Sequence, residues 1–182
     1  NRGDPKDRGV IYPYFGSAVA NLMGPGNSGL PPYVWAKPGS GGFKYQDAGF
    51  LGPKFGALAI GEGEPPPNIL LPETLSSTNN ADRNSLREFA NQQYSQKRPP
   101  KFSEAQNFVY DTAQALMQKR SLFDNPAPKD VARYGDTPLG RDMLIGRKMI
   151  EAGVRFVKVN SYGWDTHGDN FNAHASLMPR FD

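Results

Sequence analysis

The most regular hydrophobic pattern lies near the end of the chain. Apolar side chains are almost continuous over residues 154–159, namely Val154, Phe156, Val157 and Val159. A short apolar run that starts directly after a glycine predicts a central β-strand covered on both faces. It is the only confident strand in the sequence.

Between residues 73 and 182 the pattern is otherwise helical. Ser103 and Thr137 are predicted N-caps, and Pro138 suits a first helical turn. One predicted helix turns Phe108 and Leu116 to the same side. The predicted helices are 82–96 (starting near Asn80 or Asp82), 103–122, 126–134, 137–153 and a last one that begins over 172–178. A helix followed by a buried strand, a loop and another helix indicates an α/β fold.

Residues 1–72 hold 25 of the 37 Gly and Pro residues, so we expect this segment to be rich in loops. One short helix is predicted over residues 14–23, with Phe15, Val19 and Leu22 as its apolar face. Residues 30–35, which include two prolines, indicate an edge-like extended segment. Segments 1–72 and 73–182 are expected to belong to one larger domain.

Composition narrows the possible functions. The chain has 182 residues, of which 37% are hydrophobic and 21% charged, and a net charge of +3. This charge is too small and too scattered to predict nucleic-acid binding. There is no cysteine, which excludes disulfides and thiolate sites. No apolar stretch is long enough for a membrane span. Because the chain starts at Asn1 without an initiator Met and stops at Asp182 inside a helical pattern, we expect a processed or partial chain. The absence of a signal peptide is then uninformative about the precursor.

The candidate chemistry lies in residues 160–170, directly after the predicted strand. Asp165, His167 and Asp169 are spaced two residues apart, so an extended backbone would turn them to the same side. Carboxylate and imidazole groups suit a divalent metal such as Zn, Mn, Fe or Ca, and an open coordination position would support hydrolysis. Asp165 and His167 are the predicted ligands, with Asp169 as a candidate third.

A simpler interpretation of this loop stays open. Asp165 would then cap a turn, His167 would lie on the surface, and Asp169 would belong to a turn. Ser161 and Thr166 fit backbone hydrogen bonding better than nucleophilic catalysis.

Neighbouring residues have less specific expectations. His174 is predicted to lie on the surface, and Trp164 is predicted to be a buried ring that fixes the loop. Arg155 should pair with Glu151 or Asp142. The glycine-rich residues 39–42 lack the Lys and Ser/Thr of a phosphate-binding loop and indicate a turn, whereas residues 45–52 could line a pocket.

Several motifs resemble those of a large bacterial family, domain of unknown function 1501. Trp164-Asp-Thr-His167, after its strand, is the most specific of them. The other matching segments follow in the same order as in the family: 15–19, 30–34, 48–52, 133–135 and 152–157. The resemblance covers nearly the whole chain.

The resemblance implies an exported protein, periplasmic or extracellular, of the alkaline phosphatase/sulfatase superfamily. It implies a three-layer α/β/α domain in which Asp165 and His167 correspond to presumed metal ligands. It also implies that an early Asp and a Ser or Thr nucleophile precede Asn1, and that a later Asp-His pair follows Asp182. The partners of this chain would then be the remaining parts of the same protein or another chain.

Three functional hypotheses follow. The first is the middle portion of a metal-dependent phosphate- or sulfate-ester hydrolase. The second is a non-catalytic structural or binding protein with the same fold, whose interface would lie in residues 1–72. The third is a carbohydrate-binding module that uses exposed aromatic rings, with Tyr33, Trp35 and Tyr45 as candidates.

Overall fold

A computed structural model describes residues 9–37, 48–66, 69–96 and 101–180. Within them, three parallel strands form a small sheet in the order β2-β1-β3. The strands are β1 (Tyr33–Ala36), β2 (Leu58–Ile60) and β3 (Phe156–Val159). Val34 of β1 pairs with Leu58 on one side and with Val157 on the other. The described part of the chain is therefore a mixed α/β structure, as the sequence predicted.

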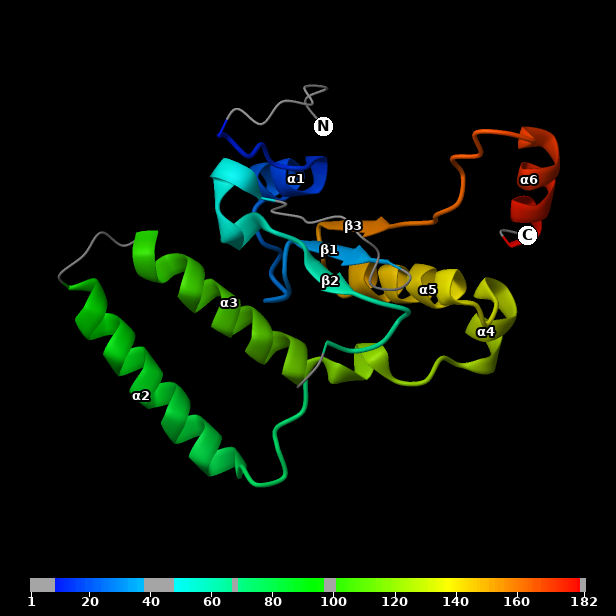
Figure 1. Cartoon of the computed structure of the whole chain (residues 1–182). Coiled ribbons are helices and arrows are strands. Elements are labelled where there is room, and N and C mark those ends of the chain that lie inside the picture. The colour runs from blue at the N-terminus through cyan, green and yellow to red at the C-terminus, as the bar shows by residue number, and fades with distance from the viewer. Residues whose placement is uncertain (1–8, 38–47, 67–68, 97–100, 181–182) are drawn as a thin grey trace.

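Six α-helices accompany the sheet in the described residues (Figure 1). Short 3₁₀ helices occur at 49–51, 53–55, 120–123 and 178–180. The α-helices are α1 (Phe15–Met23), α2 (Ser77–Ser95), α3 (Lys101–Gln118), α4 (Pro128–Tyr134), α5 (Pro138–Glu151) and α6 (Asn170–Leu177). None of the described helices is both long and apolar enough to cross a membrane.

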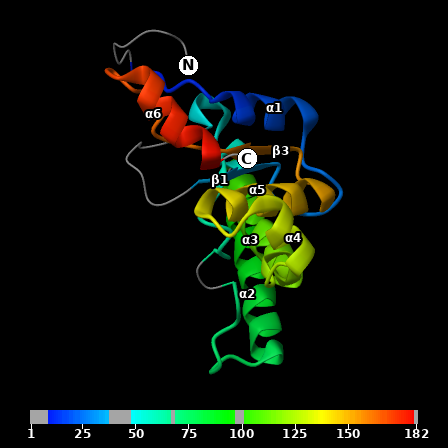
Figure 2. The ribbon, with the colours of Figure 1, turned by 90° about the vertical axis from the view of Figure 1, so that its right-hand side faces the viewer.

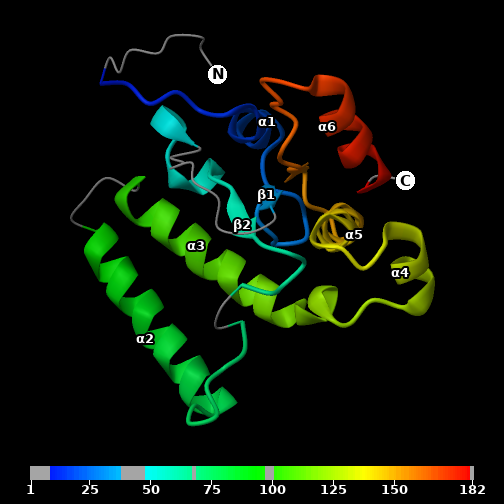
Figure 3. The same ribbon diagram turned by 45° about the vertical axis from the view of Figure 1, so that its right-hand side comes forward.

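Alternate residues of β1 supply the two halves of the core. Val34 and Ala36 pack with Leu116 of α3 and Met149 of α5. Tyr33 and Trp35 point to the opposite face, where they pack with Ala20 of α1. Figures 1 and 3 show α1 on one side of the sheet and α5 with α3 on the other. The described residues therefore form three layers, with the sheet in the middle.

The prediction of which strand is central was wrong. β1 was expected to be edge-like, yet all four of its residues are buried and it lies between the other two strands. β3 was expected to be covered on both faces, yet each of its residues is only half-buried, and it forms one edge of the described sheet. The two prolines misled the prediction because both precede β1, so neither removes a ladder N–H from it.

The apolar face predicted for α1 was also wrong. Phe15 and Leu22 are 73% and 84% exposed, whereas Gly16 and Ala20 are buried. A Cβ placed on Gly16 would lie 2.6 Å from the Tyr33 ring. Small residues therefore face the sheet because α1 approaches it too closely to accommodate large ones.

The predicted helices exist, but some of their ends differ. Thr137 caps α5 as predicted, and its Oγ1 accepts a hydrogen bond from Gly140 N at 3.0 Å. Helix α2 begins earlier than expected, with Ser76 as its N-cap. Ser103 is not an N-cap, because α3 already begins at Lys101.

Helices α2 and α3 form a hairpin that runs away from the sheet (Figures 1 and 2). α3 contributes Leu116 to the core, whereas α2 has no buried residue. α6 likewise has no buried residue, and it follows a long loop after β3. These two helices are the least integrated parts of the described structure.

Candidate metal-binding loop

Residues 160–169 connect β3 to α6, and their start is fixed by β1. Asn160 N donates to the carbonyl oxygen of Ala36 at 3.2 Å. Its side-chain Oδ1 accepts a hydrogen bond from the indole Nε1 of Trp35 at 2.9 Å. Trp35 is almost fully buried, so the loop starts from a rigid point at the carboxyl end of the parallel strands. That end is where open α/β sheets usually bind ligands.

Asp165 and His167 lie next to each other in this loop. Asp165 Oδ2 is 3.3 Å from His167 Nε2, and both side chains are more than four-fifths exposed. Two donor atoms bound at ~2.0–2.1 Å to one tetrahedral ion lie ~3.3–3.4 Å apart. The separation therefore fits two neighbouring ligands of one cation. As an ion pair, such exposed groups would stabilise the fold little, because water screens them.

Asp169 does not continue the extended pattern. Its backbone is left-handed (φ 47°, ψ 45°) at the N-terminus of α6. Its carboxylate accepts hydrogen bonds from Asn172 Nδ2 at 2.8 and 3.1 Å. Within the described residues, no group of three or more His, Cys, Asp and Glu side chains is arranged to hold a metal ion. Asp165 and His167 thus supply two donors, and metal binding by them stays a prediction.

Hydrogen bonds organise the loop internally. Trp164 Nε1 donates to Ser161 Oγ at 3.0 Å, and Thr166 Oγ1 donates to Asn170 Oδ1 at 2.6 Å. His174 Nε2 lies 3.2 Å from the carbonyl oxygen of Trp164 and 3.4 Å from Thr166 Oγ1. The two hydroxyl groups therefore make hydrogen bonds within the loop, but their partners are side chains and not the backbone groups that were expected.

The side chain of Trp164 in this loop lies against that of His174 in α6. The Trp164 ring was predicted to be buried, but it is 37% exposed and lies against the His174 ring, with 5.9 Å between centroids. His174 is exposed, as predicted, but its contacts connect α6 to the loop. Sequence reasoning missed this connection; the signal was a histidine within the helix that follows the motif.

The pairing predicted for Arg155 was wrong. Arg155 is exposed, while Glu151 lies 3.4 Å from Arg147 Nε. Asp142 is fully buried on α5, where its Oδ1 accepts a hydrogen bond from Gly63 N at 3.1 Å. The other oxygen, Oδ2, is buried without a hydrogen-bond partner in the described part of the chain. Burial raises the pKa of the Asp142 carboxyl to about 6.

The aromatic candidates for sugar binding are not surface rings. Tyr33 and Trp35 are 1% and 2% exposed, so a sugar cannot stack on either ring. Tyr45 lies outside the described residues, as do residues 39–42 and residues 45–47 of the segment 45–52. The two described candidates therefore do not support the carbohydrate-binding hypothesis.

Comparison with known proteins identifies a family. A family model described as "Protein of unknown function (DUF1501)" matches residues 6–182. No curated protein and no solved structure matches the chain.

Proposed function

The chain belongs to the DUF1501 family of proteins of unknown function, and from this premise we propose that it forms the middle portion of a metal-dependent phosphate- or sulfate-ester hydrolase. The proposal includes an alkaline-phosphatase-like fold, membership of the alkaline phosphatase/sulfatase superfamily, and export to the periplasm or cell exterior. The observation that carries it is the contact between Asp165 Oδ2 and His167 Nε2, 3.3 Å apart in a loop after a parallel strand.

The position and exposure of the pair support this role. Because Asp165 and His167 are both highly exposed, neither has to leave a buried partner before it binds an ion or a substrate. Trp35 fixes the start of the loop, and His174 fixes its middle. Ligands held by such hydrogen bonds keep their geometry better than ligands on a free loop.

A divalent cation bound here would polarise a phosphoryl or sulfuryl oxygen and stabilise the charge that develops on it. Asp165 and His167 would hold the cation through one carboxylate oxygen and one ring nitrogen. A complete site needs at least one more ligand, and we assign that ligand to another segment of the same protein or to another chain. Ser161 and Thr166 already bond within the loop, so we assign the nucleophile to neither.

Metal content and ester hydrolysis of the full-length protein test the proposal. Stoichiometric Zn, Mn, Fe or Ca, together with hydrolysis of an aryl phosphate or aryl sulfate, is the expected result. Asp165→Ala and His167→Ala should each lower both readouts at least about tenfold. Asp82→Ala, which changes an exposed carboxylate on α2, is the matched control and should change neither.

The second candidate is a binding protein without catalysis. It is favoured by large apolar side chains exposed near the start of the chain, among them Val10, Ile11, Phe15 and Leu22. The same experiment separates the two candidates. A full-length protein that takes up no cation, and whose properties do not change in Asp165→Ala, would contradict the hydrolase and leave the binding role.

A further inference from the structure

Helices α2 and α3 contact each other through polar side chains rather than apolar ones. On each helix the contact positions recur three or four residues apart, which places them on one face. Meanwhile Leu86 and Phe89 of α2 are 69% and 61% exposed. Starting from the connection between the helices, three pairs of side chains are in contact. They are Ser95 with Ser103 (Oγ to Oγ, 2.6 Å), Asn91 with Asn107 (Nδ2 to Oδ1, 2.7 Å) and Arg87 with Tyr110 (4.3 Å from guanidinium to ring centre).

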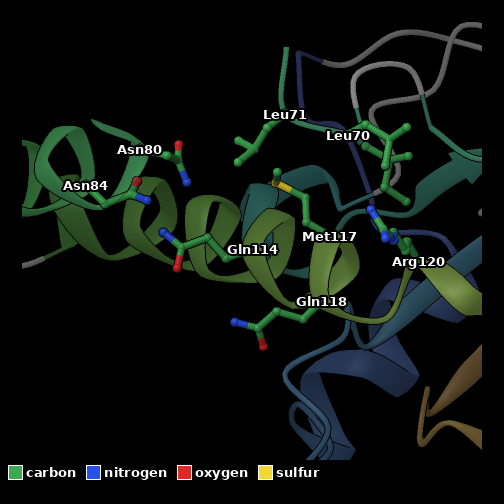
Figure 4. A pocket seen from close by; sticks show the side chains of 9 residues that line it. Leu70, Leu71, Asn80, Asn84, Gln114, Met117, Gln118 and Arg120 are labelled. Atoms are coloured by element: carbon green, nitrogen blue, oxygen red, sulfur yellow. The ribbon is translucent and has the colours of Figure 1, made fainter. Parts of the chain in front are cut away.

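We call this row of polar side chains between α2 and α3 the polar seam. Farther from the connection, the described polar side chains of the two helices no longer form hydrogen bonds with each other. Asn80, Asn84 and Gln114 continue the polar seam but line a cleft of about 460 Å³, which residues 69–71 close on a third side. Figure 4 shows the three amide groups gathered at one end of this cleft. Within the described residues, none of these three side-chain amides makes a hydrogen bond.

Apart from the exposed Gln118, the rest of the cleft lining is apolar and ends in a positive charge. Leu71 and Met117 lie between the amides and Arg120, which is next to Leu70 (Figure 4). Methionine adapts its shape to varied apolar groups, so this wall can accept a side chain of a ligand. The cleft therefore offers amides, an apolar wall and a guanidinium in a row.

We propose that this cleft binds an extended peptide that carries an apolar side chain followed by a carboxylate. Asn84 and Gln114 can each donate to a peptide carbonyl and accept from a peptide N–H. The pair Asn91–Asn107 shows that this seam already forms amide-to-amide hydrogen bonds. Arg120 supplies the charge complement for the carboxylate.

The lining argues against other ligand classes. Among the described residues that form it, none is aromatic and Arg120 alone is charged. Single-stranded nucleic acids use aromatic platforms together with several cations. Flat sugar rings lack a stacking surface here. A peptide needs neither feature, because its backbone matches the amides and its side chains match the remaining wall.

Titration of ¹⁵N-labelled protein with the blocked peptide Ac-Ala-Leu-Ala-Glu-NH₂ tests the proposal. The side-chain amide signals of Asn80, Asn84 and Gln114 should shift, with a Kd of about 1 mM or below. The Asn84→Leu/Gln114→Leu variant should abolish the shift of the remaining Asn80 side-chain signal. Gln93→Leu, at an exposed amide elsewhere on α2, is the control and should leave them unchanged.

The proposed ion pair between Arg120 and the peptide's carboxylate can be tested with the three amide side chains left in place. Replacing the peptide's Glu by Lys should weaken binding about two- to fivefold, as expected for an exposed ion pair. Arg120→Glu should reverse this preference, whereas Arg83→Glu, an exposed arginine outside the cleft, should not. The proposal is overturned if the amide signals stay unmoved, if the charge of the peptide has no effect, or if maltotriose shifts the same signals while the peptide does not.

Discussion

Asp142 shows how a single residue links two distant segments. It is fully buried on α5, and its Oδ1 accepts from the backbone N–H of Gly63, in the loop after β2. Next to it, Arg141 Nε donates to the carbonyl oxygen of Glu62 at 3.3 Å. Glu62 has a positive φ of 53°, so these contacts hold a backbone conformation that a non-glycine residue rarely adopts. Asp142 therefore determines how the loop after β2 meets α5.

Replacing Asp142 by Asn should stabilise the protein at neutral pH. Desolvation raises the pKa of Asp142 to about 6, from 3.8. Folding thus favours the protonated carboxyl of Asp142. The contribution of this group to stability is fully present below about pH 4 and is lost as the pH rises through about 6. Asn keeps the oxygen that accepts from Gly63 but carries no charge. Urea unfolding at pH 7 should show a gain of about 1–3 kcal/mol in the free energy of unfolding.

The pH dependence provides the control for this prediction. The Asp142→Asn variant should lose most of the decline in stability that the unmodified protein is expected to have between about pH 4 and 6. Asp82→Asn, at an exposed carboxylate, should keep that decline. A variant that is less stable than the unmodified protein at every pH would show that the charge of Asp142 does not destabilise the folded state.

Single residues were the hardest feature to predict from the sequence. The spacing of Asp165 and His167 predicted that their side chains lie on the same side, because spacing acts through local geometry, and they do lie 3.3 Å apart; their role as metal ligands stays a prediction. The role of Gly16 was not predicted, because it depends on the ring of Tyr33, a residue of β1 that α1 packs against. Asp142 was considered only as a partner for Arg155. Contacts across layers decide such roles, and a single sequence does not display them.

At the scale of elements, helices were predicted better than strands. The Thr137 cap acts within one turn of α5, so the local sequence contains its signal. β2 has three residues, too few for a periodic pattern, and was missed. Only the neighbours of a strand decide whether it is central or at an edge, which is why β1 and β3 were misassigned.

The polar seam of the α2–α3 hairpin makes an element-scale prediction. Asn91→Leu alone leaves Asn107 without its partner and should cost about 1 kcal/mol. Adding Asn107→Leu removes both polar groups and should recover most of that loss, because two leucines can pack across the seam. A double-mutant cycle by thermal unfolding, followed by circular dichroism, measures the coupling, expected at about 0.5–1.5 kcal/mol.

The exposed amide Gln93 provides the reference for this cycle. Gln93→Leu combined with Asn107→Leu should be additive, since the Gln93 side chain is exposed and makes no hydrogen bond to Asn107. If Asn91→Leu and Asn107→Leu were equally additive, the two amides would not stabilise the hairpin as a pair, and the seam would be held by its other contacts.

For the molecule as a whole, stability should be unevenly distributed. β1 is buried over its full length, and α5 contributes Ile145 and Met149 to the core, whereas α2 and α6 bury no residue. Segments with few buried contacts open by local fluctuation at lower free energy than the global unfolding reaction. The described structure therefore combines one stable layered body with two weakly attached helical segments.

Hydrogen exchange measured by mass spectrometry tests this distribution. Peptides that cover β1 and α5 should exchange with the free energy of global unfolding, and those from α2 and α6 at a free energy lower by at least about 2 kcal/mol. Added Zn²⁺ should slow exchange in residues 160–177 of the full-length protein and leave α2 unchanged, because only the former segment contains Asp165 and His167. If α6 were as protected as α5 without metal, the loop would be held by contacts with the rest of the protein. Its internal hydrogen bonds would then not be what keeps the Asp165–His167 pair in place.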